Sequence, residues 1–248
     1  MDWIDRFAYS NRLRFVHPGQ KVALALLVIA LCLASDKPLV GLLAAAWMVA
    51  LAVIMARLPL RVFGGAVFTE GVFLLWAVMG IAVSIHAGGG RWPLTFSITA
   101  ESLAAAQRPF ARALGGAATM AFLAFTTPLV DLLDLGRRVG VPLVLLDLAT
   151  LIYRFVFVLL ESLQRMVSAQ ETRLGYSNMR RAMHSAALVA TRLLVDAYQR
   201  SQRLQTALDS RGYAGDLRVL PTQYQHSWPL WWVTAAVCLS LGMVWWLI

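Results

Sequence analysis

The fold class is decided by residues 229–248, which read PLWWVTAAVCLSLGMVWWLI and include no charged side chain. A helix that crosses the hydrocarbon core of a bilayer, about 30 Å thick, needs roughly 20 apolar residues. Trp231 and Trp232 lie near one end of this run, and Trp245 and Trp246 lie near the other. Tryptophan is enriched at both membrane interfaces. The segment is therefore predicted to be a transmembrane helix.

The composition of the whole chain points to several such helices. Of 248 residues, 59% are hydrophobic and 14% are charged, whereas a soluble domain is about half apolar and about a quarter charged. Four further apolar segments occupy residues 22–35, 39–56, 62–85 and 111–127, and the first two form a hairpin. The sequence predicts an all-α polytopic membrane protein with about five transmembrane helices.

The positive charges predict how the chain is oriented. Its formal net charge is +9, and cytoplasmic loops of membrane proteins carry an excess of lysine and arginine. With the N-terminus inside, 18 of the 22 lysines and arginines lie inside, and the four outside are Lys37, Arg91, Arg108 and Arg112. We therefore predict a cytoplasmic N-terminus and an external C-terminus. The surplus of positive charge requires no nucleic-acid partner.

Residues 128–227 are predicted to form a cytoplasmic helical domain between the N-terminal segment with four transmembrane helices (1–127) and the last helix (228–248). An amphipathic helix at 128–139 is followed by Gly140 and Pro142, which end it. Long helices are predicted from 142 to about 175 and over 179–210. On the second, apolar and small residues recur at steps of four and three, a seam that needs a partner helix: Met183, Ala187, Ala190, Leu194, Ala197, Ser201, Leu204 and Leu208.

The two long helices end in the same pattern. Five positions recur at an offset of 38 residues: Gln164/Gln202, Arg165/Arg203, Ala169/Ala207, Glu171/Asp209 and Arg173/Arg211. Each ending is expected to place an arginine in the last turn, with Gly175 or Gly212 as the left-handed stop. An arginine there also complements the helix dipole, worth about 0.3–1 kcal/mol. Two matched endings favour a partner that offers the same groove twice, such as a two-fold ATPase dimer.

Four stretches carry a resemblance to a known family. They are residues 127–142 (TPLVDLLDLGRRVGVP) leading to 153–155 (YRF), the Arg173 ending, residues 207–213 (ALDSRGY), and the opening 4–14 (IDRFAYSNRLR) with 17–21 (HPGQK). Together they span nearly the whole chain. The chain resembles the transmembrane coupling subunit, or T component, of energy-coupling factor (ECF) transporters, specifically the CbiQ type found in cobalt importers. The second ending fits the family's Ala-Arg-Gly pattern as Ser-Arg-Gly, whereas the first reads Thr-Arg-Leu.

This resemblance implies a multi-subunit importer in the bacterial inner membrane. The chain would be the scaffold between two ATP-binding cassette ATPase subunits and a CbiM-like substrate-capture membrane subunit, with a small accessory membrane subunit in some complexes. Its coupling residues would be Thr172, Arg173, Gly175, Ser210, Arg211 and Gly212, supported by Arg165, Glu171, Arg203 and Asp209. ATP-driven closing of the ATPases would pull the two arginine tips together and reorient the capture subunit. The cargo implied is cobalt for cobalamin biosynthesis, with nickel or a vitamin as the alternative.

Catalytic, cofactor and metal sites are not predicted in this chain. The sequence contains no GxxxxGK[ST] motif, so ATP hydrolysis is assigned to the partner subunits. The four histidines are scattered, and only His86 is retained as a weak metal candidate. Paired carboxylates, a Ser-His pair or clustered metal ligands, which a membrane enzyme would need, are also missing from the sequence.

Glu70 is the one carboxylate inside a predicted span, and intramembrane carboxylates are commonly functional. It would either pair with a polar group on another span or face the capture subunit, and the sequence leaves both open. A self-contained secondary transporter, with Glu70 and Arg154 lining a pathway, is the alternative from another class. The lack of an inverted repeat and the position of the repeated motif outside the predicted spans argue against it.

Overall fold

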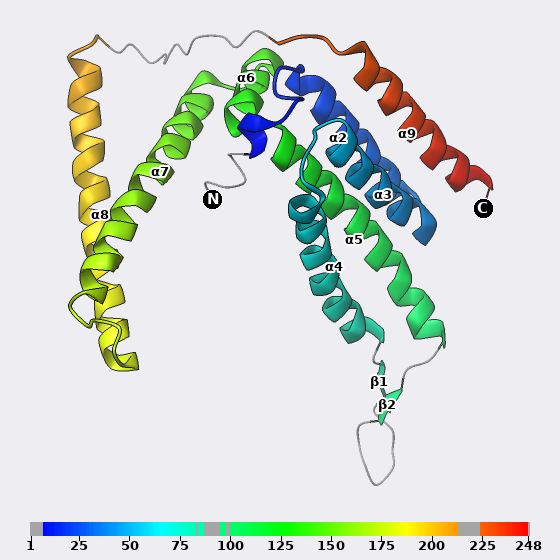
Figure 1. Ribbon diagram of the computed structural model, residues 1–248, viewed down its shortest axis with the longest axis horizontal. Helices are drawn as coiled ribbons and strands as arrows, with labels where there is room; N and C mark the ends of the chain where they lie inside the picture. The colour runs from blue at the N-terminus through cyan, green and yellow to red at the C-terminus, as the bar shows by residue number, and fades with distance from the viewer. Residues whose placement is uncertain (1–6, 83, 87–94, 98–99, 213–223, 248) are drawn as a thin grey trace. The chain divides into compact units, whose positions relative to one another are not determined.

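The computed structural model describes residues 7–82, 84–86, 95–97, 100–212 and 224–247. These residues are helical except for one short hairpin and the connecting turns, so the all-α prediction is confirmed (Figure 1). The chain divides into two compact units. Unit 1 comprises Met1–Leu132 and Thr222–Ile248, and unit 2 comprises Leu133–Pro221.

Unit 1 contains five long helices and the hairpin. The elements are α2 (Pro18–Ala34), α3 (Pro38–Ile54), α4 (Leu60–Ala82), β1 (Ser84–His86), β2 (Thr95–Ser97), α5 (Ala100–Thr126) and α9 (Trp228–Leu247). Proline opens α2 and α3, where its missing N–H is not needed. The strands are antiparallel, with Ile85 opposite Phe96. Arg91 and Tyr213 lie outside the described residues, as does the side chain of His86.

Helix α5 is the centre of unit 1, and it packs against α2, α3 and α4. Helix α9 lies along α2 and α3, as Figure 1 shows. Fully buried side chains from these helices, among them Leu24, Met48 and Phe122, form one apolar core. Two glycines let α3 and α5 approach closely. A Cβ at Gly41 would overlap the backbone carbonyl of Ala111, and one at Gly115 would lie 2.8 Å from the carbonyl oxygen of Gly41.

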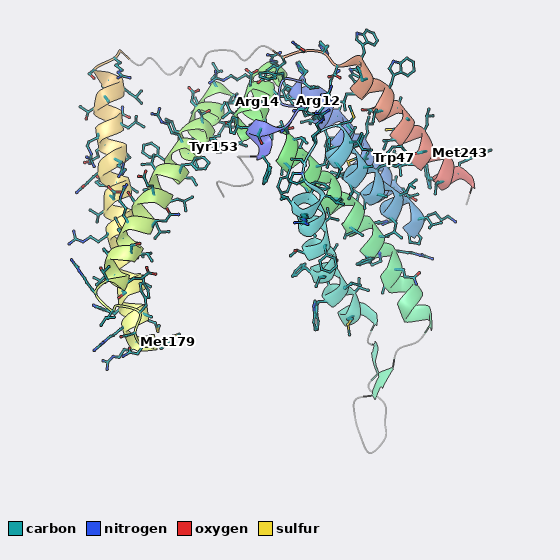
Figure 2. All side chains as sticks on the ribbon, in the orientation of Figure 1. Arg12, Arg14, Trp47, Tyr153, Met179 and Met243 are labelled. Atoms are coloured by element: carbon teal, nitrogen blue, oxygen red, sulfur yellow. The ribbon has the colours of Figure 1, made fainter. Side chains whose placement is uncertain are left out.

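Unit 2 is built on an antiparallel pair of long helices. They are α7 (Leu143–Glu171) and α8 (Met179–Asp209), which lie side by side in Figure 1. Met179, labelled in Figure 2, opens α8 directly after the connecting turn. The short helix α6 (Leu129–Val139) contributes residues to both units. Gly140, with φ +89°, follows it, and Arg137 forms an ion pair of 3.0 Å with the buried Asp147 of α7.

The helices appear close to where the sequence predicts them, except that α5 begins at Ala100 and not near residue 111. Their membrane-crossing potential differs from helix to helix. Among the described residues, three helices are long and apolar enough to cross a bilayer: Leu60–Gly80, Leu143–Glu171 and Trp228–Trp246. A fourth span results if Ala106–Thr126 and Leu129–Val139, bent by 98°, are taken together. Helices α2 and α3 are apolar but shorter. Helix α7 is predicted to be cytoplasmic, but because its first half is apolar it is one of the three helices that could cross a bilayer.

The predicted seam on α8 does not lie in the contact between α8 and α7, so its partner helix stays a prediction. Met183 and Leu194, two of its members, are 66% and 72% exposed. The face turned toward α7 instead carries Ser185 and Val189, which are buried, followed by Arg200. Small and hydrogen-bonding side chains make this contact, so the pattern of apolar residues does not identify it. Five of the eight residues of the seam are exposed in the described part of unit 2, and the other three are partly buried.

Candidate functional site

The first arginine ending has a complete Schellman geometry. The N–H of Gly175 donates to the carbonyl of Gln170 at 2.8 Å, and the N–H of Leu174 donates to the carbonyl of Glu171 at 2.9 Å. These two bonds satisfy carbonyls that the end of α7 leaves without helical partners. Leu174 occupies the left-handed position with φ +56°. The stop is therefore Leu174, and the expectation that Gly175 would adopt this conformation is wrong.

Gly175 has a different role in the turn. A Cβ at this position would lie 2.5 Å from the hydroxyl oxygen of Ser185 and 2.9 Å from the carbonyl of Gln170. The Ser185 hydroxyl donates to the carbonyl of Gly175 at 3.1 Å. Gly175 is needed because α8 approaches the turn closely, and not because of its own backbone conformation.

The second ending repeats the first at the same offset. Gly212 takes the left-handed conformation with φ +68° at the position equivalent to Leu174. The hydroxyl of Thr172 donates to the carbonyl of Ala169 at 3.0 Å, and the hydroxyl of Ser210 donates to that of Ala207 at 3.0 Å. The two sequence repeats are thus two copies of one local structure, each with an arginine directly before the left-handed residue.

Both arginines are available at the surface. Arg173 and Arg211 are exposed, and within the described part of the chain neither guanidinium forms a hydrogen bond or an ion pair. A guanidinium offers five donors in a planar fork that suits carboxylates and clustered carbonyl groups. Each ending therefore presents a set of donors that the unit itself does not use.

The separation of the arginines is set by α8. Arg173 is followed by the short turn that leads into α8, and Arg211 lies two residues after the last residue of the same helix. Helix α8 has 31 residues, which corresponds to a length of about 46 Å at about 1.5 Å per residue. The two arginines consequently lie at opposite ends of the α7–α8 pair.

Polar contacts hold the two helices together midway between the endings. Arg200 donates from Nε to Asp196 at 2.9 Å and from Nη2 to the Ser162 hydroxyl of α7 at 3.1 Å. The hydrogen bond from Arg200 lowers the pKa of Asp196 below its ordinary value, so this carboxylate is charged at neutral pH. The supporting arginines act locally. Arg165 pairs with Glu161 at 2.6 Å, and Arg203 donates to the carbonyl of Gln199 at 3.2 Å.

The predicted acidic neighbours have modest roles within the chain. Asp209 accepts a hydrogen bond of 2.9 Å from Gln205, and Glu171 is exposed. In unit 1, Oε2 of Glu70 is buried and has no hydrogen-bond partner among the described residues. Pairing of that oxygen with another described span is therefore not observed. No group of three or more metal-ligating side chains occurs in the part of the chain that the structure describes.

Sequence reasoning missed a buried polar cluster in unit 1. Lys21 has no exposed surface, and its ammonium donates to the carbonyl of Thr126 at 2.9 Å. The hydroxyl of Tyr224 donates to Oδ1 of Asp131 at 3.2 Å. Only a weak signal for this cluster is present in the sequence, namely a lysine directly before an apolar run and an aspartate shortly after the Thr127-Pro128 break.

These features define a polytopic helical membrane protein whose second unit carries two equivalent arginine-tipped helix ends. Comparison with known proteins then identifies the family. Residues 10–222 match the family model CbiQ, described as a cobalt transport protein, and the chain therefore belongs to the CbiQ cobalt transport protein family.

Three relatives illustrate the similarity. The cobalt transport protein CbiQ of Rhodobacter capsulatus is 33% identical over 220 residues, covering 89% of this chain and 88% of the relative. An uncharacterized protein of Methanocaldococcus jannaschii, MJ1089, is 32% identical over 226 residues, covering 88% of this chain and 83% of the relative. A fused cobalt transport protein CbiMQ of Methanocorpusculum labreanum is 29% identical over 236 residues, covering 92% of this chain and 39% of the relative.

Proposed function

We propose that the chain is the transmembrane coupling subunit of an ECF-type, ATP-driven importer of cobalt ions. The observation that carries this proposal is the pair of structurally equivalent endings, each presenting an exposed arginine before a left-handed residue. A repeated surface of this kind is suited to a partner that occurs twice. The chain itself would be non-catalytic, and two ATP-binding cassette subunits would hydrolyse ATP.

Each arginine would enter a groove of one ATPase subunit and bind carboxylates or the carbonyl end of a helix. Such acceptors complement a guanidinium, and a bond to a charged group is worth about 1.5–3 kcal/mol. Arg173 and Arg211 would make the contact, while Thr172, Ser210, Gly175 and Gly212 would fix the shape of each ending. The acidic residues Glu171 and Asp209 lie beside them and would limit which partner surfaces are accepted.

The length of α8 changes the mechanism that the sequence alone indicates. Because Arg173 is tied to the start of α8 and Arg211 to its end, the two tips have little freedom to approach one another. We therefore propose that movement of the ATPases turns or shifts the α7–α8 pair as a whole. ATP binding would favour one position of this pair only if the grooves bind it better in that position.

A CbiM-like membrane protein is the proposed second partner. The fused relative joins two cobalt transport units in one chain, of which the part similar to this chain is the smaller share. Unit 2 also exposes large apolar side chains, including Leu148, Ile152 and Leu194, at 53%, 54% and 72% of their surface. Exposed apolar side chains of this size are suited to contact with protein or lipid. A small accessory membrane subunit would complete some complexes.

Cobalt is the proposed cargo, and cobalamin biosynthesis the proposed use, because the family and two of the relatives named here are described as cobalt transport proteins. The proposed location is the bacterial inner membrane. The N-terminus and unit 2 would be cytoplasmic and the C-terminus external, in agreement with the distribution of positive charge. In this orientation both arginine endings face the compartment that contains ATP.

The test compares two double variants of the full chain, purified in mild detergent from native membranes. Arg173→Ala with Arg211→Ala removes both tips. The control, Arg180→Ala with Arg192→Ala, removes the same charge from exposed sites on α8. Co-purifying chains are identified by mass spectrometry. We expect ATP-binding cassette subunits with the wild type and the control, and at least a tenfold lower yield with the first variant, since two charged contacts are lost.

Two results would contradict the proposal. One is equal recovery of the ATPase subunits with both double variants. The other is cobalt transport by the purified chain alone in liposomes, without any ATPase. That result would favour the alternative of a secondary transporter, and Glu70 and Arg154 would be the residues to test next.

A further inference from the structure

A buried polar cluster surrounds the point where α5 ends. Lys21 is among the largest fully buried side chains in the described residues, and it donates to the carbonyl of Thr126 at 2.9 Å. Thr126 is the last residue of α5, and α6 continues from there after a bend of 98°. The carbonyls of a last helical turn have no partner within their helix. Lys21 therefore fastens the start of α2 to the end of α5.

Asn11 reinforces the same point from the N-terminal segment. Its Nδ2 lies 3.3 Å from the carbonyl oxygens of both Phe125 and Thr126, and 2.7 Å from that of Ala8. Oδ1 of Asn11 and the hydroxyl of Thr127 are buried without a hydrogen-bond partner among the described residues. Unpaired buried groups are rare in a static core. Here Oδ1 of Asn11 and the hydroxyl of Thr127 could form hydrogen bonds in a second conformation of the cluster.

The same cluster joins the two points at which the chain passes between the units. The chain leaves unit 1 after Leu132 and returns to it at Thr222. Asp131 precedes the first point, Tyr224 follows the second, and the Tyr224 hydroxyl donates to Asp131 Oδ1 at 3.2 Å. The charge of Asp131 also acts on the ammonium group of Lys21. One lysine, one aspartate and one tyrosine thus connect the outgoing and returning segments to α2 and α5.

The returning segment is held by further contacts to the N-terminal segment. The N–H of Gln225 donates to the carbonyl of Phe15 at 2.8 Å, and the N–H of His17 donates to the carbonyl of Gln225 at 3.1 Å. The rings of His17 and His226 stack at 5.2 Å. These contacts lie directly before α9, so a displacement of the returning segment reaches α2 as well as α9.

We infer that Lys21, Asp131 and Tyr224 form the joint through which displacement of unit 2 is passed to the helices of unit 1. This inference rests on the proposed coupling function, and the three side chains act as positioning residues. Stability alone is a poor reason to bury a lysine and an aspartate, because apolar side chains of similar volume often stabilise a core as well or better. With the joint intact, the segment that follows α5 and the segment that precedes α9 move together.

The experiment measures cobalt uptake and ATP hydrolysis in the same liposomes, using the assembled transporter. The readout is the number of cobalt ions taken up per ATP hydrolysed. We expect Tyr224→Phe to lower this ratio about fivefold and Lys21→Met to lower it further, because each variant removes coupling between sites and leaves the ATPase contacts intact. Asp131→Asn keeps an oxygen that can accept from Tyr224 but removes the charge that acts on Lys21, so adding it to Tyr224→Phe should lower the ratio below that of Tyr224→Phe alone.

Thr234→Val is the matched control. Thr234 is buried in α9, and its hydroxyl donates only within its own helix, to the carbonyl of Leu230 at 2.8 Å. A general loss of stability lowers uptake and hydrolysis in proportion, so the control should leave the ratio unchanged.

An unchanged ratio of uptake to hydrolysis in Tyr224→Phe would overturn the inference, whether both rates stay the same or fall in proportion. If Lys21→Met fails to assemble, Tyr224→Phe decides alone, since it removes a single oxygen and keeps the ring. The proposed function fails separately, when the wild-type chain assembles with no ATPase or shows no ATP-dependent uptake.

Discussion

The two units differ in what holds them together. Unit 1 has a continuous core in which side chains of α2, α3, α4, α5 and α9 pack around small residues. Among the described residues of unit 2, only five side chains are buried, and three of them are polar: Leu146, Asp147, Ser162, Ser185 and Val189. Unit 1 is therefore stabilised by close packing. Unit 2 depends on a few hydrogen bonds and keeps most of its surface available to other molecules.

This difference predicts opposite sensitivities. A change of volume should damage unit 1 more than unit 2, because a packed interior cannot absorb extra atoms. Removing a hydrogen bond should lower the stability of unit 2 by more than the exposed surface of this unit would suggest. The three tests below sharpen this contrast in order of decreasing effect.

The largest effect is expected from Gly41→Ala in unit 1. The added Cβ would overlap the backbone carbonyl of Ala111, so α3 and α5 must separate. We expect a loss of about 3 kcal/mol or more in the free energy of unfolding, measured by thermal denaturation in detergent. Gly65→Ala is the control, because no heavy atom lies within 4 Å of a Cβ at Gly65. Equal stability of both variants would mean that close packing is not what holds unit 1.

An intermediate effect is expected from Asp147→Asn in unit 2. Arg137 then loses its ion pair of 3.0 Å with a side chain that is only 4% exposed. We expect a cost of about 2 kcal/mol, less than for a fully buried pair because Arg137 is partly exposed. Hydrogen exchange of backbone amides at the end of α6 and the start of α7 should accelerate. Asp134→Asn removes the more exposed pair with Arg138 and should cost at most about 0.5 kcal/mol.

The smallest effect concerns the two endings of unit 2. Leu174 is left-handed at φ +56°, where Gly212 occupies the equivalent position at φ +68°. Leu174→Gly should stabilise the unit by about 1 kcal/mol, and Gly212→Ala should destabilise it by a similar amount. Thermal unfolding followed by circular dichroism would show shifts of opposite sign. Shifts of the same sign would mean that the two endings are not equivalent.

The positions of the helices could be predicted because their ends carry local signals. Gly140 and Pro142 mark a boundary within the sequence itself, and α8 begins at the residue predicted and ends one residue earlier than predicted. The repeated endings were visible for the same reason, since a fixed offset of 38 residues needs no knowledge of the fold.

The remaining features depend on contacts that the sequence does not encode locally. The left-handed Leu174 was missed because a glycine stands next to it and leucine seldom adopts this conformation. The contact between Asp131 and Tyr224 joins residues 93 positions apart. The face of α8 that meets α7 cannot be read from the apolar pattern, because its buried positions include Ser185 and lie apart from the apolar seam. The identity of the coupling arginines stays a prediction until their partner is examined.

The continuous helix α8 has a consequence for how the chain can change over evolutionary time. Removing one residue from it would shorten the spacing of the arginines by about 1.5 Å and rotate the second arginine by about 100° around the helix axis. Exchanging one exposed residue for another would change neither quantity. Homologous chains should therefore tolerate many substitutions along α8 but few insertions or deletions, so that the number of residues in this helix is inherited more strictly than their identity.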